Sequence, residues 1–405
     1  MKEKFIPADK QNFDKRQRSI VLHYTVLEEK ASVETLTRGG VGAHFLIPKQ
    51  PFEDDKGEIC DYYRFTDIDD RTWHAGRSDF AGRSGLNDTS IGIEIVNYGY
   101  GLVQESEEVL FTYQVENKLK NFITETLKKE DESLYRLLES EKLLMAFLSD
   151  MMRGLVPPPD RKSYEQVSSE IIKKYKQLTK EWRVVNDPFL NIAYKDLYQL
   201  EVEGKLIWDE YTDYQIETIA KLIKEIIEPK LIIKNEKTGE IYYQIPPQFI
   251  TGHMAIALGR KIDPGPRLFI ELAKQGVGAW PDEEQSLSIE QEINAEKGFD
   301  YKWIQDNLNI WGYKVESTGE FDEQTQNAIR AFQMQFEPEN YSGEPNVRTI
   351  SVLESLIKEY YPDKQSEYPR SFNPSNEKKS SSFFKVSPNL DTGDTVSVFN
   401  CCVIS

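Results

Sequence analysis

The sequence has 405 residues, too many for one typical domain, and this length predicts two folded units with flanking segments. Its apolar content of 39% and aromatic content of 12% exclude a disordered chain. The formal net charge of −18 argues against a nucleic-acid partner, because phosphate binding needs clustered Lys and Arg.

The N-terminal segment Met1–Lys10 is charged and lacks the apolar core of a secretory signal. No stretch approaches the roughly 20 apolar residues of a membrane span, so we expect a chain that is soluble as translated. The three cysteines are Cys60, Cys401 and Cys402, and their spacing fits neither a zinc finger nor a disulfide framework.

Short apolar runs in the first hundred residues predict three buried strands, over residues 20–24, 41–47 and 90–97. A helix is predicted over residues 211–228, where Thr212 and Gln215 form a capping-box signal and isoleucines recur on one face. Pro229 is expected to stop this helix. Strands interleaved with helices predict an α/β layer domain.

Helical patterns dominate two further parts of the chain. Residues 105–204 carry long charged helical patterns, broken by three prolines, and are predicted to be a helical insertion or lid. Residues 289–362 are predicted to form a small all-α C-terminal domain. Residues 363–405 lack a periodic apolar face and are predicted to be a flexible tail.

Two of the four histidines, His23 and His253, lie at the ends of strand-like segments, and Asp263 follows ten residues after the second. Two imidazoles and one carboxylate leave a fourth tetrahedral position for water, which is the composition of a catalytic zinc site. Zinc would lower the pKa of that water and polarise a scissile carbonyl. Spacing alone leaves the plainer interpretation open, in which each histidine is a hydrogen-bonded core residue.

Such chemistry needs a general base, and Glu94 is a lone carboxylate within an apolar strand, where burial costs free energy unless the charge is used. Lys261, near Asp263, could stabilise the oxyanion of the tetrahedral intermediate. The alternatives are that Glu94 faces solvent and that Lys261 is a surface lysine.

Several ordered blocks resemble the zinc N-acetylmuramoyl-L-alanine amidases, whose fold is shared with peptidoglycan recognition proteins. These blocks are Leu22–Thr25, Val41–Ile47, Trp73–Gly76, Leu86–Glu94, Gly252–Pro266 and Gly276–Pro281. The resemblance implies an amidase domain over residues 1–282, with a central mixed sheet flanked by helices. It also implies that His23, His253 and Asp263 bind zinc, that Glu94 is the general base, and that Lys261 assists at the oxyanion.

The same resemblance places His44, His74 and Asn87 around the cleft, as substrate contacts or as groups that support the zinc ligands. The insertion at residues 105–204 has no counterpart in compact members of the family. It puts substrate size and access in doubt.

The C-terminal helical unit resembles the peptidoglycan-binding-like domain often fused to these amidases, on the pattern Thr318–Asp322, Thr325, Ala328, Ile329 and Phe332-Gln333. These residues would also make the core of any small helical domain, so the sequence does not decide whether this unit binds the cell wall.

The last four residues, Cys402–Ser405, form a CaaX pattern typical of farnesylation, and Cys401 could take a second acyl chain. Prenylation is eukaryotic whereas the amidase chemistry is bacterial. We therefore expect delivery into a eukaryotic host and anchoring at a host membrane, with the bacterial cytoplasm as the alternative location.

The favoured function is zinc-dependent hydrolysis of the amide bond between N-acetylmuramic acid and L-alanine in peptidoglycan or muropeptides. Two alternatives remain at this stage. One is a non-catalytic module that recognises muropeptides, and the other is an interaction protein that meets a host partner through its insertion.

Overall fold

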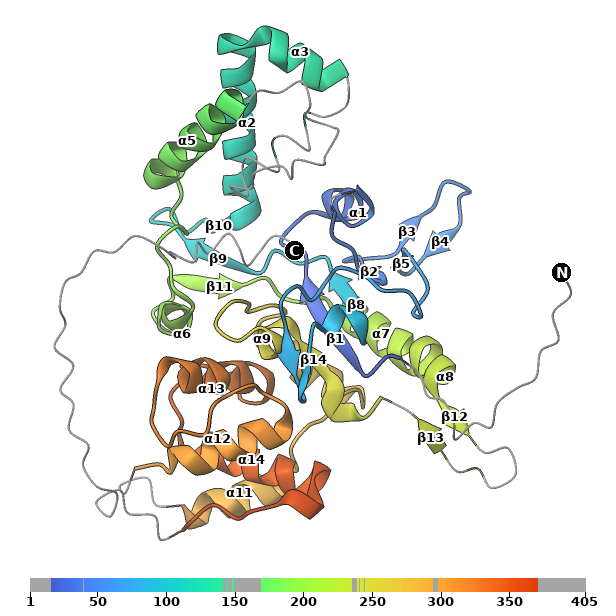
Figure 1. Cartoon of the computed structure of the whole chain (residues 1–405), viewed down its shortest axis with the longest axis vertical. Coiled ribbons are helices and arrows are strands. Elements are labelled where there is room, and N and C mark those ends of the chain that lie inside the picture. The colour runs from blue at the N-terminus through green and yellow to red at the C-terminus, as the bar shows by residue number, and fades with distance from the viewer. Residues whose placement is uncertain are drawn as a thin grey trace, which may run out of the picture.

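The computed structural model describes residues 16–370, except for residues 39, 141–143, 145–147, 149–168, 235–238, 240, 244 and 294–297. Figure 1 shows three parts: an α/β domain around a central sheet, a helical insertion that projects away from this sheet, and a C-terminal group of helices.

The central sheet has five strands in the order β14 (Ile250–Gly252), β1 (Ser19–Tyr24), β8 (Ser90–Ile95), β2 (Phe45–Ile47) and β5 (Tyr63–Arg64). The first four strands are parallel and β5 is antiparallel to β2, so the predicted mixed sheet is confirmed. Strands β1, β8 and β2 are buried along their whole length, as expected for parallel strands covered on both faces. The predicted strand at 41–47 is shorter, because only its last three residues pair.

Helices cover this sheet and connect its strands. They are α1 (Glu29–Arg38), α7 (Asp213–Lys221), α8 (Glu228–Leu231), α9 (His253–Ile256) and α10 (Leu268–Lys274). Short hairpins at the rim pair β3 (Phe52–Glu53) with β4 (Ile59–Cys60), β6 (Asp79–Phe80) with β7 (Arg83–Ser84), and β12 (Ile233–Lys234) with β13 (Ile241–Tyr243).

The capping box predicted for α7 is confirmed: the Thr212 side chain accepts a hydrogen bond from the backbone N of Gln215, whose own side chain accepts one from Thr212 N. The expectation that Pro229 stops the helix was wrong. A π-helical turn at Leu222–Ile227 leads directly into α8, and Pro229 lies in its first turn. The backbone is helical on both sides of this junction, so Pro229 lies within the helical run and not at its end.

The insertion begins with a three-stranded sheet of β9 (Tyr100–Val103), β10 (Val109–Phe111) and β11 (Leu206–Trp208). Its helices are α2 (Thr112–Glu130), α3 (Glu132–Ser140), α5 (Ser169–Asn186) and α6 (Leu197–Val202). Helices α2, α3 and α5 have a hydrophobic cluster of their own, separate from that of the α/β domain. Buried Arg183 of α5 pairs with Glu116 of α2, which ties the two long helices together, and also with Asp187 just after α5.

The C-terminal unit consists of α11 (Glu283–Glu292), α12 (Tyr301–Trp311), α13 (Glu323–Phe336) and α14 (Val347–Tyr360). It begins earlier than the predicted residue 289, because α11 packs against α14. Two buried glutamines repeat one network: Gln305 bonds Gly319 N and Thr325 Oγ1, and Gln333 bonds Gly343 N and Thr349 Oγ1. This internal repeat holds each helix against the loop and the helix start that follow it.

The C-terminal unit shares one continuous hydrophobic core with the α/β domain. Thr251 in β14 donates a buried hydrogen bond of 2.9 Å to Gln335 of α13, and α9 packs against α13. At the same junction Trp208 Nε1 donates to Tyr341 Oη at 2.9 Å. The unit is therefore fixed against the segment that carries His253.

The predicted tail begins later than residue 363. Tyr368 is buried against Trp303, and Arg370 forms an ion pair with the buried Glu354 of α14. Residues up to 370 therefore belong to the folded unit.

Cys401 and Cys402 lie outside the described residues, and lipidation and cellular location stay predictions. Within the described part of the chain, no helix combines the length and apolar character needed to cross a membrane.

Candidate metal centre and active site

The sheet topology brings His23, Glu94 and His253 together at the carboxyl ends of three neighbouring strands. His23 is the fifth residue of β1 and is the register partner of Glu94 in the parallel strand β8. On its other side β1 pairs with β14, where Leu22 lies opposite Gly252, so His253 follows directly at the start of α9. Ligand sites in such sheets form at the carboxyl ends of the strands, where these side chains lie.

His23, His253 and Asp263 form a compact buried triangle. The Nδ1 atoms of the two histidines are 3.0 Å apart, and each lies 3.0 Å from Asp263 Oδ2. Among the described residues, this is the group of His, Cys, Asp and Glu side chains whose ligand atoms could hold a metal ion. Asp263 reaches the triangle because its backbone carbonyl accepts a 2.9 Å bond from Met254 N, which joins its loop to α9. The structure thus brings together the three predicted ligands, which are up to 240 positions apart in the sequence.

The electrostatics of this triangle favour a donor set that is ready for a cation. Burial lowers the pKa of His253 to about 3, against the opposing effect of Asp263. Burial alone would raise the pKa of Asp263, but His253 and His23 beside it outweigh burial and hold that pKa below its ordinary value. At neutral pH the site therefore presents a neutral His253 imidazole and an ionised Asp263. The second carboxylate oxygen, Asp263 Oδ1, is buried without a hydrogen-bond partner among the described residues.

Glu94 is buried in β8 on the same face of the sheet as His23, because register partners in neighbouring parallel strands share a face. Burial raises the pKa of Glu94 to about 7; His23 and Lys261 lower it, and Asp263 raises it. Its Oε2 atom has no hydrogen-bond partner within the described structure. The alternative that Glu94 faces solvent was wrong, since the residue is only 1% exposed.

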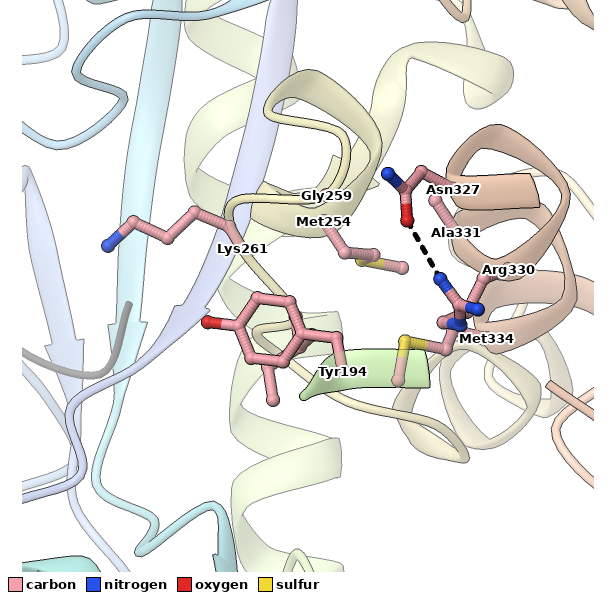
Figure 2. A pocket seen from close by; sticks show the side chains of 9 residues that line it. Tyr194, Met254, Gly259, Lys261, Asn327, Arg330, Ala331 and Met334 are labelled. Carbon is pink, nitrogen blue, oxygen red and sulfur yellow. Dashed lines mark hydrogen bonds between the residues drawn. The ribbon is translucent and has the colours of Figure 1, made fainter. Parts of the chain in front are cut away.

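Lys261 is also buried, so it is not a surface lysine. A small pocket lies between the α/β domain and α13, and Lys261 forms part of its wall with Asn327 and Arg330. Figure 2 shows the Lys261 side chain extending away from Asn327 and Arg330, toward the strands of the sheet. Its positive charge lowers the pKa of Glu94 and of His253.

His44, His74 and Asn87 lie behind the triangle. His44 Nδ1 accepts from Gly92 N, and its Nε2 contacts the carbonyl of Asp70. His74 contacts His23 directly, with 3.0 Å between His74 Nδ1 and His23 Nε2. The Asn87 Oδ1 atom accepts from the backbone N of His74. All three side chains are buried with protein partners, which favours a supporting role; their role as substrate contacts stays a prediction.

The sequence analysis missed two residues of this site, Ser90 and Gly92. Ser90 contacts His74 Nε2 at 3.1 Å. A Cβ at Gly92 would lie 2.5 Å from His74 Cγ, so only glycine leaves room for the imidazole ring. The signal was present in the alternation of β8, which places Ser90, Gly92 and Glu94 on one face.

Two family models match the chain. Residues 13–136 match the family described as N-acetylmuramoyl-L-alanine amidase, and residues 297–353 match the one described as "Putative peptidoglycan binding domain". The first match covers His23 and Glu94 and ends within the insertion. His253 and Asp263 lie beyond it, so the tertiary structure is what completes the site.

Individual relatives match over more of the chain. N-acetylmuramoyl-L-alanine amidase AmiD of Escherichia coli strain K12 is 25% identical over 350 residues, which span 86% of this chain and 85% of that protein. The structure of AmiD from E. coli with the substrate anhydro-N-acetylmuramic acid-L-Ala-D-gamma-Glu-L-Lys has a TM-score of 0.54 at 23% identity, and covers 87% of this chain and 93% of that one. The crystal structure of AmpDH3 from Pseudomonas aeruginosa has a TM-score of 0.53 at 26% identity, and covers 88% and 100%.

Proposed function

We propose that this chain, an N-acetylmuramoyl-L-alanine amidase with a C-terminal peptidoglycan-binding-type domain, uses a zinc ion to hydrolyse the bond between N-acetylmuramic acid and L-alanine. The observation that carries the zinc assignment is the buried triangle of His23 Nδ1, His253 Nδ1 and Asp263 Oδ2.

The residues present fit zinc on three grounds. Two imidazoles and one carboxylate are the ligand types of catalytic zinc sites, with a fourth position left for water or substrate. A tetrahedral ion with bonds of about 2.0–2.1 Å holds its ligands roughly 3.3 Å apart, close to the 3.0 Å edges of this triangle. Asp263 Oδ1 is buried without a hydrogen-bond partner among the described residues, and a bound cation would compensate the charge of this carboxylate. When bound, zinc would polarise the scissile carbonyl and lower the pKa of a water molecule.

Glu94 is assigned as the general base. It lies beside His23 in the register of the sheet, and its pKa of about 7 suits a group that must accept a proton at neutral pH and then release it. The same carboxyl would return that proton to the leaving L-alanine nitrogen. Its buried position keeps bulk water from competing for the proton.

Lys261 is assigned to the carbonyl oxygen of the scissile amide. A buried ammonium beside this oxygen favours the transition state, because negative charge develops there as the amide carbon becomes tetrahedral. Lys261 and Asp263 lie on the same short loop, so one loop supplies both a metal ligand and the oxyanion partner.

The proposed substrate is a muropeptide, on the evidence of the AmiD complex with an anhydro-muramoyl peptide and of the C-terminal domain match. We test this with purified protein and two defined muropeptides, one with ordinary and one with anhydro-N-acetylmuramic acid. Release of the stem peptide is measured with and without a chelator, and after zinc is added back.

Release that the chelator stops and zinc restores supports the proposal. His253→Ala should remove both zinc and activity, whereas Glu94→Gln should keep zinc and lower kcat by about 10²–10⁴-fold. Zinc binding without release from either muropeptide would reject the proposed hydrolysis and favour a muropeptide-recognition module.

A further inference from the structure

One short segment, His74–Ala75, lies directly behind both histidines of the triangle. His23 Nε2 is 3.0 Å from His74 Nδ1, and His253 Nε2 is 3.3 Å from the carbonyl oxygen of Ala75. The side-chain oxygen of Asn87 accepts hydrogen bonds from the backbone N of His74 and of Ala75, at 3.0 and 2.7 Å. Each histidine therefore has one ring nitrogen on the triangle and the other on this segment.

The direction of the hydrogen bonds can be read from Ser90. Its Oγ lies 2.6 Å from the carbonyl oxygen of Leu86, and a carbonyl only accepts, so the single hydroxyl hydrogen is donated there. Ser90 Oγ must then accept from His74 Nε2 at 3.1 Å. Neutral imidazole carries one hydrogen, so His74 Nδ1 is bare and accepts from His23 Nε2.

The consequence is that a neutral His23 ring keeps its lone pair on Nδ1. The same argument applies to His253, because the Ala75 carbonyl can only accept and His253 Nε2 must donate. Both bare Nδ1 atoms are the ones that lie 3.0 Å from each other and from Asp263 Oδ2. All three atoms can therefore turn a lone pair toward the point that a shared cation would occupy.

The fit of the His74 ring depends on the face of β8 beneath it. Gly92 leaves the space for the ring, since an added Cβ would lie 2.5 to 2.8 Å from three of its atoms. Ser90, two residues earlier on the same face, meets Nε2 of the ring. The β8 strand thus places the ring and also selects which of its nitrogens carries the hydrogen.

We propose that Ser90, His74 and the Ala75 carbonyl form a positioning relay that fixes both His23 and His253 in the Nε2–H tautomer, before any metal binds. This inference rests on the proposed function, because it assigns Nδ1 of both residues to the zinc. These groups do not touch the substrate; they act through the ligands, whose basicity and ring orientation depend on such partners.

The first test measures zinc affinity by competition with a chelator of known affinity. Ser90→Ala and His74→Leu remove a step of the relay and are expected to weaken zinc binding by about 10–100-fold. His74→Gln retains one acceptor and one donor and should recover most of the loss. Ser32→Ala is the matched control, since Ser32 is an equally buried serine whose hydroxyl donates only to the backbone carbonyls of Leu27 and Glu28.

Wild-type zinc affinity in His74→Leu would overturn the relay, as would equal weakening in Ser32→Ala, which would reveal a general loss of folding. A wild-type protein that binds no zinc would contradict the proposed function instead. The relay is then decided by its second test, which needs no metal.

The second test observes the tautomers directly in metal-free, ¹⁵N-histidine-labelled protein. The chain has only four histidines, so each ring can be assigned by a single substitution. His23, His74 and His253 are expected to carry their hydrogen on Nε2, and Ser90→Ala should shift His74 and His23 toward a mixture of tautomers. An Nδ1–H tautomer at His74 in the wild-type protein would refute the relay.

Discussion

Replacing Glu94 by Gln is expected to stabilise the metal-free protein, by an amount that grows with pH. Burial holds the pKa of Glu94 near 7, whereas its ordinary value is 4.5. Below pH 4.5 the carboxyl group is protonated in the folded and the unfolded chain alike, so it contributes no difference. As the pH rises toward 7 the unfolded chain ionises first, and the free energy of unfolding falls until both states are ionised.

The magnitude follows from the two pKa values. Their difference, at about 1.4 kcal/mol per pKa unit, makes an ionised Glu94 cost about 3 kcal/mol of folding free energy. Glutamine fills nearly the same volume and does not titrate, so the variant avoids this loss. Its advantage should be about 1 kcal/mol at pH 5 and about 3 kcal/mol at pH 8.

The assay is urea unfolding of chelator-treated wild type and Glu94→Gln at both pH values. Glu116→Gln is the control, because Glu116 is a buried carboxylate that is paired, with its oxygens 2.8 and 3.1 Å from Arg183 Nη2. That substitution should destabilise the protein by about 1–3 kcal/mol at either pH. Equal stability of wild type and Glu94→Gln at pH 8, or a difference that does not change with pH, would refute the reasoning.

Three further substitutions have defined outcomes. Gly92→Ala should lower the free energy of unfolding by about 1–3 kcal/mol, because the new Cβ meets the His74 ring, whereas Gly42→Ala, with 3.7 Å to the nearest atom, should leave the urea midpoint unchanged. Arg183→Met leaves the buried carboxylates of Glu116 and Asp187 without their cation and should lower the free energy of unfolding by about 3–5 kcal/mol. Limited proteolysis of this variant should cut the insertion before the α/β domain. Cleavage of both at the same time would contradict this expectation. His253→Ala should retain no zinc after dialysis, and metal analysis that finds zinc as in wild type would exclude this ligand.

Local patterns in the sequence were enough to predict much of the fold. The apolar runs that became β1 and β8 are buried at every position, and such runs are typical of parallel strands whose two faces are both covered. The Thr212 and Gln215 capping box predicted the start of α7 because both of its hydrogen bonds are local. The path of the chain through Pro229 was not predicted in this way, since a π-helical turn at Leu222–Ile227 precedes it and no local sequence signal was found for that turn.

The sequence by itself determined the chemical identity of the site: the ligand types, the lone carboxylate at Glu94, and the resemblance of its ordered blocks to the amidases. Only the tertiary structure decided that His23 and His253, 230 residues apart, meet through the pairing of β1 with β14. It also decided that His74 supports the site from behind. The physical reason is that residue spacing determines which face of a strand is buried, whereas strand register and long-range packing determine what that face meets.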